Sequence, residues 1–213
     1  MDLQIQGKTA LVTGSTAGIG LAIGRRLAAE GAQVVLTGRD PDKLQQAVEE
    51  LRASTGAEVS GVVADVATAE GAATVQASVP EVDILVNNLG IYESKAFEQI
   101  TDTDWHRYFE INVMSGVRMA RGYFPTMLTS GTGRIIFISS ETGLAVDPGM
   151  IHYAMTKTAQ LSIARGLAGL TRGTGVTVNS VLPGPTRSEG IVDYLRSIAS
   201  NPAASAEEAE VEF

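Results

Sequence analysis

The sequence predicts an α/β fold of the doubly wound type, a Rossmann-type parallel sheet with helices on both faces. Short, continuously apolar segments alternate with segments whose apolar residues recur at helical spacing, which is typical of such a sheet. A glycine-rich turn at residues 14–20 directly follows the first apolar segment. The 213 residues, 44% of them hydrophobic, contain no internal repeat and no linker. We therefore expect one domain with a sizeable core.

Six strands are expected where the apolar runs lie, at residues 8–13, 33–37, 58–63, 82–86, 134–138 and 176–182. Between them, helical periodicity predicts helices over residues 19–30, about 42–53, within 68–78, from 102 to about 127, and through Tyr153 to about 170. Gly31 ends the first helix, and Thr101 with Asp104 has the form of a capping box that begins the long one. Residues 131–133 are expected to form a turn.

Composition narrows the classes of function. A net charge of −8 without a basic run argues against nucleic-acid binding. Because there are no cysteines, disulfides and thiolate metal sites are excluded, and neither histidine has metal-ligand spacing with carboxylates. No apolar run approaches ~18 residues and no signal peptide precedes the first strand, so we expect a cytoplasmic protein that does not bind membranes.

The turn at residues 14–20 has the position of a phosphate-binding loop. In a parallel sheet, glycines after the first strand let the backbone approach a pyrophosphate, which the N-terminus of the next helix then faces. A structural turn is the alternative, because such turns are also rich in glycine. A Walker A loop is excluded since no Gly-Lys-Ser/Thr follows, and the glycines at 14, 18 and 20 do not have Gly-x-Gly-x-x-Gly spacing. We expect nucleotide binding.

Tyr153 and Lys157 are four residues apart, so on a helix their side chains share one face. An ammonium group beside a phenol favours the phenolate and lowers the phenol's pKa from its usual value near ~10. The pair could then act as a general acid/base on an alcohol or carbonyl oxygen. Alone it could also be part of a solvated helix face.

Several motifs occur together in one order along residues 7–188. They are Thr13-Gly14-x-x-x-Gly18-Ile19-Gly20, Asn87-Asn88-x-Gly90, Asn112, Ser140, Tyr153-x-x-x-Lys157 and Pro183-Gly184. In content and order the series resembles that of the short-chain dehydrogenase/reductase family. One difference is Leu89, which stands where the family usually has alanine.

The resemblance implies a catalytic set. Tyr153 would exchange the proton, Ser140 would hydrogen-bond the substrate oxygen, and Lys157 would lower the pKa of Tyr153 and hold the nicotinamide ribose. Asn112 would belong to a proton relay that runs through water to the lysine. Ser139 is the neighbouring alternative to Ser140, but only one of two successive strand residues should face the site.

The resemblance also implies a nicotinamide cofactor. A dinucleotide fold that selects NAD usually has an acid at the end of its second strand, whereas arginine suits a 2′-phosphate. Gly38 followed by Arg39 therefore favours NADP(H), while Ala17, where many such relatives carry a second base, leaves NAD(H) possible. The expected cofactor-binding residues are Gly14, Ser15, Thr16, Gly18, Ile19, Gly20, Arg39, Asp65, Val66, Asn88, Gly90, Tyr153, Lys157, Pro183, Gly184, Thr186 and Ser188.

The expected activity is hydride transfer between NADP(H) or NAD(H) and a small alcohol or carbonyl substrate. The alternative is a catalytically weak nucleotide-binding regulatory or scaffold protein. Specificity should come from the loops after the fourth to sixth strands. Relatives imply a homodimer or homotetramer built on the helices at 102–127 and 150–170.

The end of the sequence departs from the family pattern. Conventional members continue with a further helix and a seventh strand, neither of which is found before Phe213. We expect residues 1–190 to form the catalytic domain. Residues 191–213 would be a remnant of the substrate-lid region or a disordered tail, and the chain would lack the C-terminal segment of its relatives.

Overall fold

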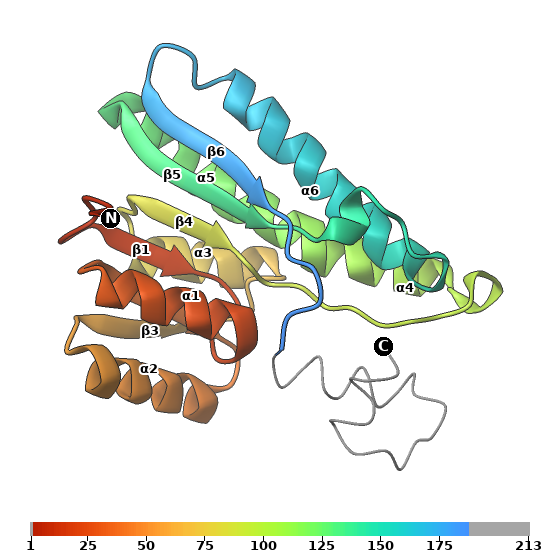
Figure 1. Ribbon diagram of the computed structural model, residues 1–213, viewed down its shortest axis with the longest axis horizontal. Coiled ribbons are helices and arrows are strands. Elements are labelled where there is room, and N and C mark those ends of the chain that lie inside the picture. The colour runs from red at the N-terminus through yellow and green to blue at the C-terminus, as the bar shows by residue number, and fades with distance from the viewer. Residues whose placement is uncertain (1, 188–213) are drawn as a thin grey trace.

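Six parallel strands form the sheet of the computed structural model, which describes residues 2–187 (Figure 1). The strands are β1 (Thr9–Val12), β2 (Gln33–Gly38), β3 (Val59–Val63), β4 (Ile84–Asn87), β5 (Thr132–Ile138) and β6 (Gly175–Val181). Their order is β3-β2-β1-β4-β5-β6, and each adjacent pair is parallel. The predicted doubly wound sheet is confirmed.

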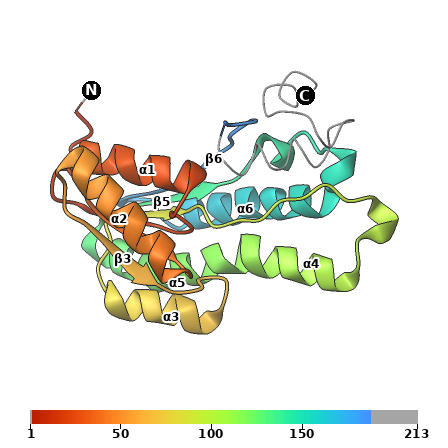
Figure 2. The same ribbon diagram turned by 90° about the horizontal axis from the view of Figure 1, so that it is seen from below.

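Helices cover the two faces of the sheet (Figure 2). On one face lie α1 (Gly18–Ala29) and α2 (Pro41–Thr55), and on the other lie α3 (Ala69–Ser78), α5 (Ser115–Ser130) and α6 (Ile151–Gly169). Successive strand side chains point to opposite faces. Leu11 therefore packs in the α3–α5–α6 core, while Ala10 and Val12 pack in the α1–α2 core.

The long helix predicted from residue 102 has an interruption that the sequence pattern did not reveal. It begins as α4 (Asp102–Phe109), passes through a π-helical turn at Glu110–Met114, and continues as α5 to Ser130. The capping box at its start is present, since Thr101 accepts from the Asp104 amide and the Asp104 carboxylate accepts from the Thr101 amide. The π turn widens the helix at Asn112, where the backbone amide of Ser115 donates to the carbonyl of Glu110.

Other boundaries differ by a few residues. β5 begins at Thr132, inside the predicted turn, because Gly131 alone ends α5 in a left-handed conformation with φ +73°. β4 begins and ends later than the predicted strand at 82–86. In the part of the chain that the structure describes, three short 3-10 helices, η1 (Phe97–Gln99), η3 (Glu141–Gly143) and η4 (Pro148–Met150), lie in loops for which the sequence predicted no structure.

Among the described residues, β3 and β6 are the sheet edges. Val176 and Val178 of β6 face the α3–α5–α6 core, whereas Thr177, Asn179 and Val181 on the opposite face are exposed. Within residues 2–187, the sheet has the six strands that the sequence predicted. The predicted remnant at 191–213, like the cofactor residue Ser188, lies outside the described residues.

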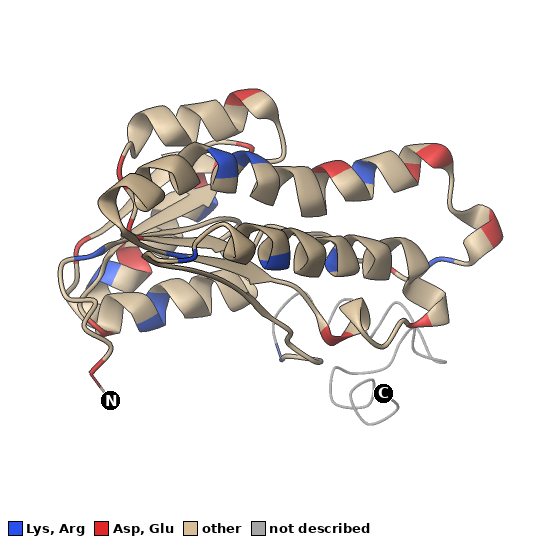
Figure 3. Ribbon diagram, turned by 90° about the horizontal axis from the view of Figure 1, so that it is seen from above, with Lys and Arg blue, Asp and Glu red and all other residues tan. Residues whose placement is uncertain are grey.

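Charged residues of both signs are spread over the helices of both layers rather than gathered by sign (Figure 3). Within residues 2–187, no helix is both long and apolar enough to span a bilayer.

Candidate active site

The predicted site residues follow strands that end at the same edge of the sheet. β1 lies between β2 and β4. The strands that follow β1 in the sequence are therefore added first on one side of it, as β2 and β3, and then on the other side, as β4, β5 and β6. Doubly wound sheets bind ligands at such a switch point, beyond the carboxyl ends of the strands. Residues 13–20 follow β1, residues 88–90 follow β4, Ser139 and Ser140 follow β5, and residues 182–186 follow β6.

The glycine turn has the backbone that a phosphate site requires. Gly14 and Gly18 have φ values of +60° and +57°, in the left-handed region that favours glycine. A Cβ at Gly20 would lie 2.6 Å from the carbonyl oxygen of Gly14, so the helix packs closely on the turn. The α1 N-terminus, with Ala17 as N-cap, has no side-chain cap and no acidic residue in its first turn. Its N–H groups and positive dipole end fit an anion.

Asn88 and Thr13 tie the glycine turn to β4. The Asn88 side-chain amide donates to the carbonyls of Thr13 and Gly14, both at 2.9 Å. The Asn88 backbone amide donates to the Thr13 hydroxyl at 3.0 Å. The Asn88 amide group is thereby engaged in holding the turn, which makes it a structural support of the cofactor site.

Two residues of the expected cofactor set are directed into the protein. Ser15 is fully buried; its hydroxyl donates to the Val12 carbonyl and accepts from the Thr37 amide, and its own amide donates to the Thr37 carbonyl. Val66 is 2% exposed and packs in the α3–α5–α6 core. Neither side chain reaches the surface of the turn, so a cofactor contact at Ser15 or Val66 stays a prediction that concerns the backbone. Asp65 remains partly exposed and accepts from the Ala67 amide.

An acidic side chain at the end of β2 would require the Thr16 side chain to move. A Cβ at Gly38 would lie only 2.5 Å from the Cγ2 methyl of Thr16 in the glycine turn. Arg39, the next residue, is exposed. A guanidinium at the end of the second strand, where NAD-selecting folds usually have an acid, fits a phosphorylated ribose better than a free 2′-hydroxyl.

Ser140, Tyr153 and Lys157 converge at the carboxyl end of β5. The side chains of Ser140 and Tyr153 are hydrogen-bonded, and the Lys157 ammonium lies 5.4 Å from the centre of the Tyr153 ring. Ser139 is directed elsewhere, since its hydroxyl donates to the backbone carbonyl of Lys157 at 2.9 Å. The Lys157 ammonium donates to the carbonyl of Ile138 at 2.9 Å.

Burial governs the pKa values of the pair. Desolvation raises the pKa of Tyr153, against the smaller lowering by its hydrogen bond to Ser140. We expected Lys157 to lower the pKa of Tyr153, and this expectation is wrong, because burial gives a net increase. Desolvation also lowers the pKa of Lys157 to about 8, because the charged form of a buried amine is disfavoured.

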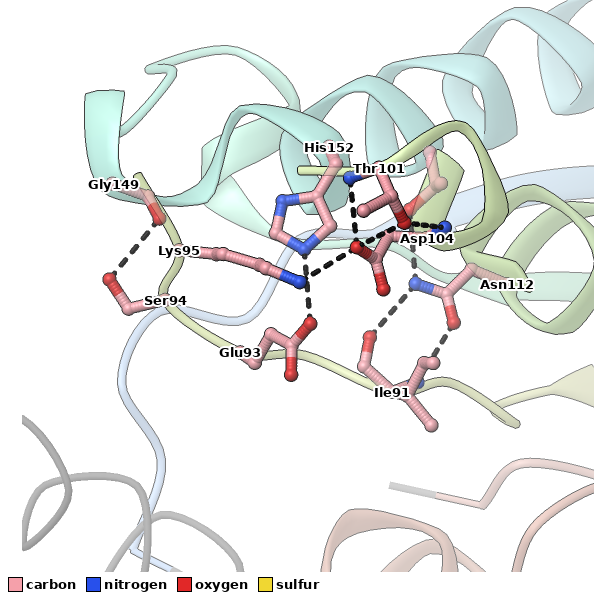
Figure 4. Close-up of polar contacts among 10 residues, drawn as sticks. Ile91, Glu93, Ser94, Lys95, Thr101, Asp104, Asn112, Gly149 and His152 are labelled. Atoms are coloured by element: carbon pink, nitrogen blue, oxygen red, sulfur yellow. Dashed lines mark hydrogen bonds and ion pairs between the residues drawn. The ribbon is translucent and has the colours of Figure 1, made fainter. Parts of the chain in front are cut away.

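Asn112, in the π turn, is fully buried and supports the loop after β4 (Figure 4). Its side-chain oxygen accepts from the Ile91 amide at 2.8 Å, and its nitrogen donates to the Ile91 carbonyl and the Thr156 hydroxyl. Its backbone carbonyl accepts from the side-chain amide of Gln160 at 2.6 Å. The structure thus places Asn112 next to the lysine region, with both its side chain and its carbonyl engaged.

Further contacts hold the segment at 91–95 (Figure 4). Lys95 pairs with Asp104 at 2.7 Å, and this bond holds the pKa of Asp104 well below its usual range. Ser94 donates to the Gly149 carbonyl, and a Glu93 oxygen lies 3.6 Å from the His152 imidazole. His152, an ordinary residue by sequence, is fully buried, with its ring 4.2 Å from that of Tyr108.

A pocket of about 460 Å³ opens beside Tyr153. Six of the predicted site residues line it: Ile19, Ser140, Tyr153, Pro183, Gly184 and Thr186. The sequence named the loops after β4 and β5 but not the individual residues that line the pocket, namely Tyr92, Glu141, Thr142, Ala145, Asp147 and Met150. Only their position after a strand end could have indicated them.

The family profile described as short chain dehydrogenase matches residues 8–196. The chain belongs to this family. It is 48% identical to an oxidoreductase of Bacillus subtilis, YvaG, itself described as uncharacterised; the alignment covers 100% of this chain and 81% of YvaG.

Solved structures of the family superpose closely on this one. The L-sorbose reductase of Gluconobacter frateurii, complexed with NADPH and L-sorbose, has a TM-score of 0.90 and 34% identity, covering 97% of this chain and 80% of its own. An actinorhodin polyketide ketoreductase solved with NADPH has a TM-score of 0.86 and 33% identity, with 95% and 80% covered.

Proposed function

We propose that the chain catalyses reversible hydride transfer between NADP(H) and a small alcohol or carbonyl compound. The observation that carries the proposal is the convergence of Ser140, Tyr153 and Lys157 beside a pocket and at the same sheet edge as the glycine turn. Membership of an oxidoreductase family supports it. A regulatory protein that only bound a nucleotide would not require this combination of polar groups.

The glycine turn and Arg39 fit NADP(H). The α1 N-terminus would face the pyrophosphate, and Arg39 would pair with the 2′-phosphate. The NADPH complexes of two similar structures, the L-sorbose reductase and the polyketide ketoreductase, support this choice. When bound, NADP(H) supplies or accepts the hydride.

Tyr153 acts as the proton donor in carbonyl reduction. Burial raises the pKa of Tyr153, so its hydroxyl remains protonated at neutral pH. Ser140 hydrogen-bonds the carbonyl oxygen and orients it towards that hydroxyl. Lys157, as a nearby ammonium, stabilises the tyrosinate that forms once the proton has been given up. Reduction at neutral pH is therefore the direction that the resting protonation states favour.

Replacing Tyr153 by phenylalanine tests the proposal. Tyr153→Phe should reduce turnover of NADPH with a panel of ketones and aldehydes by at least ~10²-fold, because the proton donor is lost. NADPH affinity, measured by fluorescence titration, should change little. Tyr123→Phe is the matched control: it also removes a buried hydroxyl, one that donates to the Val79 carbonyl at 2.8 Å, but in the core.

Turnover that persists in Tyr153→Phe would contradict the mechanism. NADPH binding by the wild type without consumption of NADPH across the panel would instead support the alternative of a nucleotide-binding regulatory or scaffold protein. Loss of both binding and turnover in Tyr153→Phe and Tyr123→Phe alike would indicate that the substitutions act through the fold.

A further inference from the structure

Gln160 is a buried polar residue for which the reaction described above has no role. It lies in the middle of α6, three residues after Lys157, and only 2% of its surface is exposed. A buried amide requires hydrogen-bond partners at both ends. Its nitrogen donates to the backbone carbonyl of Asn112 at 2.6 Å. Its oxygen accepts from the Lys157 ammonium at 3.4 Å, a long hydrogen bond.

Only one orientation of this amide satisfies both neighbours. A backbone carbonyl can only accept, so the Asn112 carbonyl requires the nitrogen of Gln160. An ammonium can only donate, so Lys157 requires the oxygen. The short bond to the π turn therefore fixes the Gln160 oxygen on the side of the ammonium, and a flipped amide would oppose like groups at both ends.

We propose that Gln160 is a positioning residue that links the π turn to the Lys157 ammonium and fixes where that ammonium sits. The proposal rests on the proposed function only in that Lys157 serves the reaction. Together with the Ile138 carbonyl at 2.9 Å, Gln160 supplies the ammonium with a second acceptor, from the same helix. It also occupies the Asn112 carbonyl, so that this oxygen is held by a side chain.

The groups around Lys157 make its protonation sensitive to this amide. β5 contributes the Ile138 carbonyl, the π turn contributes Asn112, and α6 contributes Gln160 and Tyr153, whose ring centre is at 5.4 Å. Burial lowers the pKa of Lys157. An acceptor that contacts the ammonium opposes that lowering, because it favours the charged form.

The test is a direct titration of Lys157 by NMR, with carbon-13 placed at Cε of lysine. The chain has only four lysines, at 8, 43, 95 and 157, and the Lys157→Met variant identifies the signal. Gln160→Leu should shift the pKa of Lys157 down by about one pH unit, because an acceptor is lost. Gln160→Glu should shift it up by a similar amount, because a carboxylate favours the ammonium.

Gln76→Leu is the matched control. The Gln76 side chain likewise donates from a helix to a backbone carbonyl, that of Arg118 at 2.9 Å, but it does not contact Lys157. Its loss should leave the titration of Lys157 unchanged. If Gln160→Leu does not fold, Gln160→Met, which has nearly the length of glutamine, serves the same comparison.

Unchanged titration of Lys157 in the Gln160 variants would overturn the proposal, and so would shifts in the same direction for leucine and glutamate. A shift in Gln76→Leu would show a general loosening of the core and would equally overturn it. Because the readout is a pKa and not a rate, it is separate from the proposed function, whose failure would show as turnover in Tyr153→Phe.

Discussion

Lys157 is held in the protein interior by carbonyl and amide oxygens rather than by a carboxylate. Its side chain is buried, and the lowered pKa of about 8 still leaves most of the population charged at neutral pH. The pKa of Tyr153 is raised, so at neutral pH the phenol keeps its proton while the ammonium stands nearby. These are the protonation states that carbonyl reduction needs at its start.

The buried lysine should make stability depend on pH. Its pKa falls from an ordinary value of 10.5 to about 8 on folding, so the unfolded chain binds more protons between these pH values. Stability contributed at this position therefore rises with pH across that window. Relative to Lys157→Met, the wild type should gain on the order of 2 kcal/mol in unfolding free energy between pH 7 and pH 10. Urea unfolding of both proteins at each pH measures the difference.

The comparison with Lys157→Met cancels the other groups that titrate in this range. A difference between the two proteins that stays constant with pH would show that Lys157 titrates as an exposed lysine does. A difference that falls with rising pH would mean that its charged form is favoured by folding.

At the scale of elements, the sequence predicted each of the strands found within residues 2–187, because each is a short apolar run bounded by turn residues. Helix termini were also predictable where local chemistry sets them, as at the capping box of Thr101 and Asp104. The π turn was not predictable from the sequence. Its only local signal is a polar residue, Asn112, within a helical pattern, whereas its hydrogen bonds go to residues far away in the sequence, namely Ile91, Thr156 and Gln160.

The same reasoning explains which site residues the sequence could identify. Motif residues such as Ser140 and Tyr153 stand at strand ends or on helix faces, where position indicates role. Ser15 and Val66 also follow strand ends, but their side chains turn into the core. The direction of a loop side chain depends on tertiary contacts, which the sequence pattern does not show. The protonation of Tyr153 depends on burial, which spacing alone does not reveal.

The C-terminus of α5 offers a test of local backbone control. Gly131 has φ +73° and open space around the position where a Cβ would lie. Gly131→Ala should lower the unfolding free energy by about 1 kcal/mol, because alanine is strained in the left-handed region. Gly131→Asn should cost less, since asparagine tolerates that conformation better. Thermal and urea unfolding of the two variants should separate them; equal losses would point to a cause other than backbone strain.

At the scale of the whole molecule, one half of the sheet is covered differently from the other. α1 and α2 cover β1, β2 and β3, whereas exposed side chains line the same face of β6 within residues 2–187. The chain spans 81% of the length of YvaG and 80% of that of the L-sorbose reductase. We expect substrate choice to depend on the loops that line the pocket after β4, β5 and β6, whereas the proton transfer depends on Tyr153.

Association through α4–α5 and α6 is a prediction at this scale. Phe109, at the end of α4, is 41% exposed and offers an apolar contact. The wild type should have the mass of a homodimer or homotetramer in light scattering, and Phe109→Asp should reduce it, because a charge buried in an interface is costly. Leu3→Asp, near the N-terminus and 46% exposed, is the control. A wild-type monomer would contradict the prediction.

The most direct test of the central claim follows the transferred hydrogen. NADPH carrying deuterium at the transferable position of its nicotinamide is incubated with the wild type and the carbonyl compound that it reduces fastest. Mass spectrometry should find one deuterium bound to the former carbonyl carbon of the alcohol, and Tyr153→Phe should form the labelled alcohol at least ~10²-fold more slowly. An alcohol without deuterium, or no alcohol from any carbonyl tested, would contradict hydride transfer by this site.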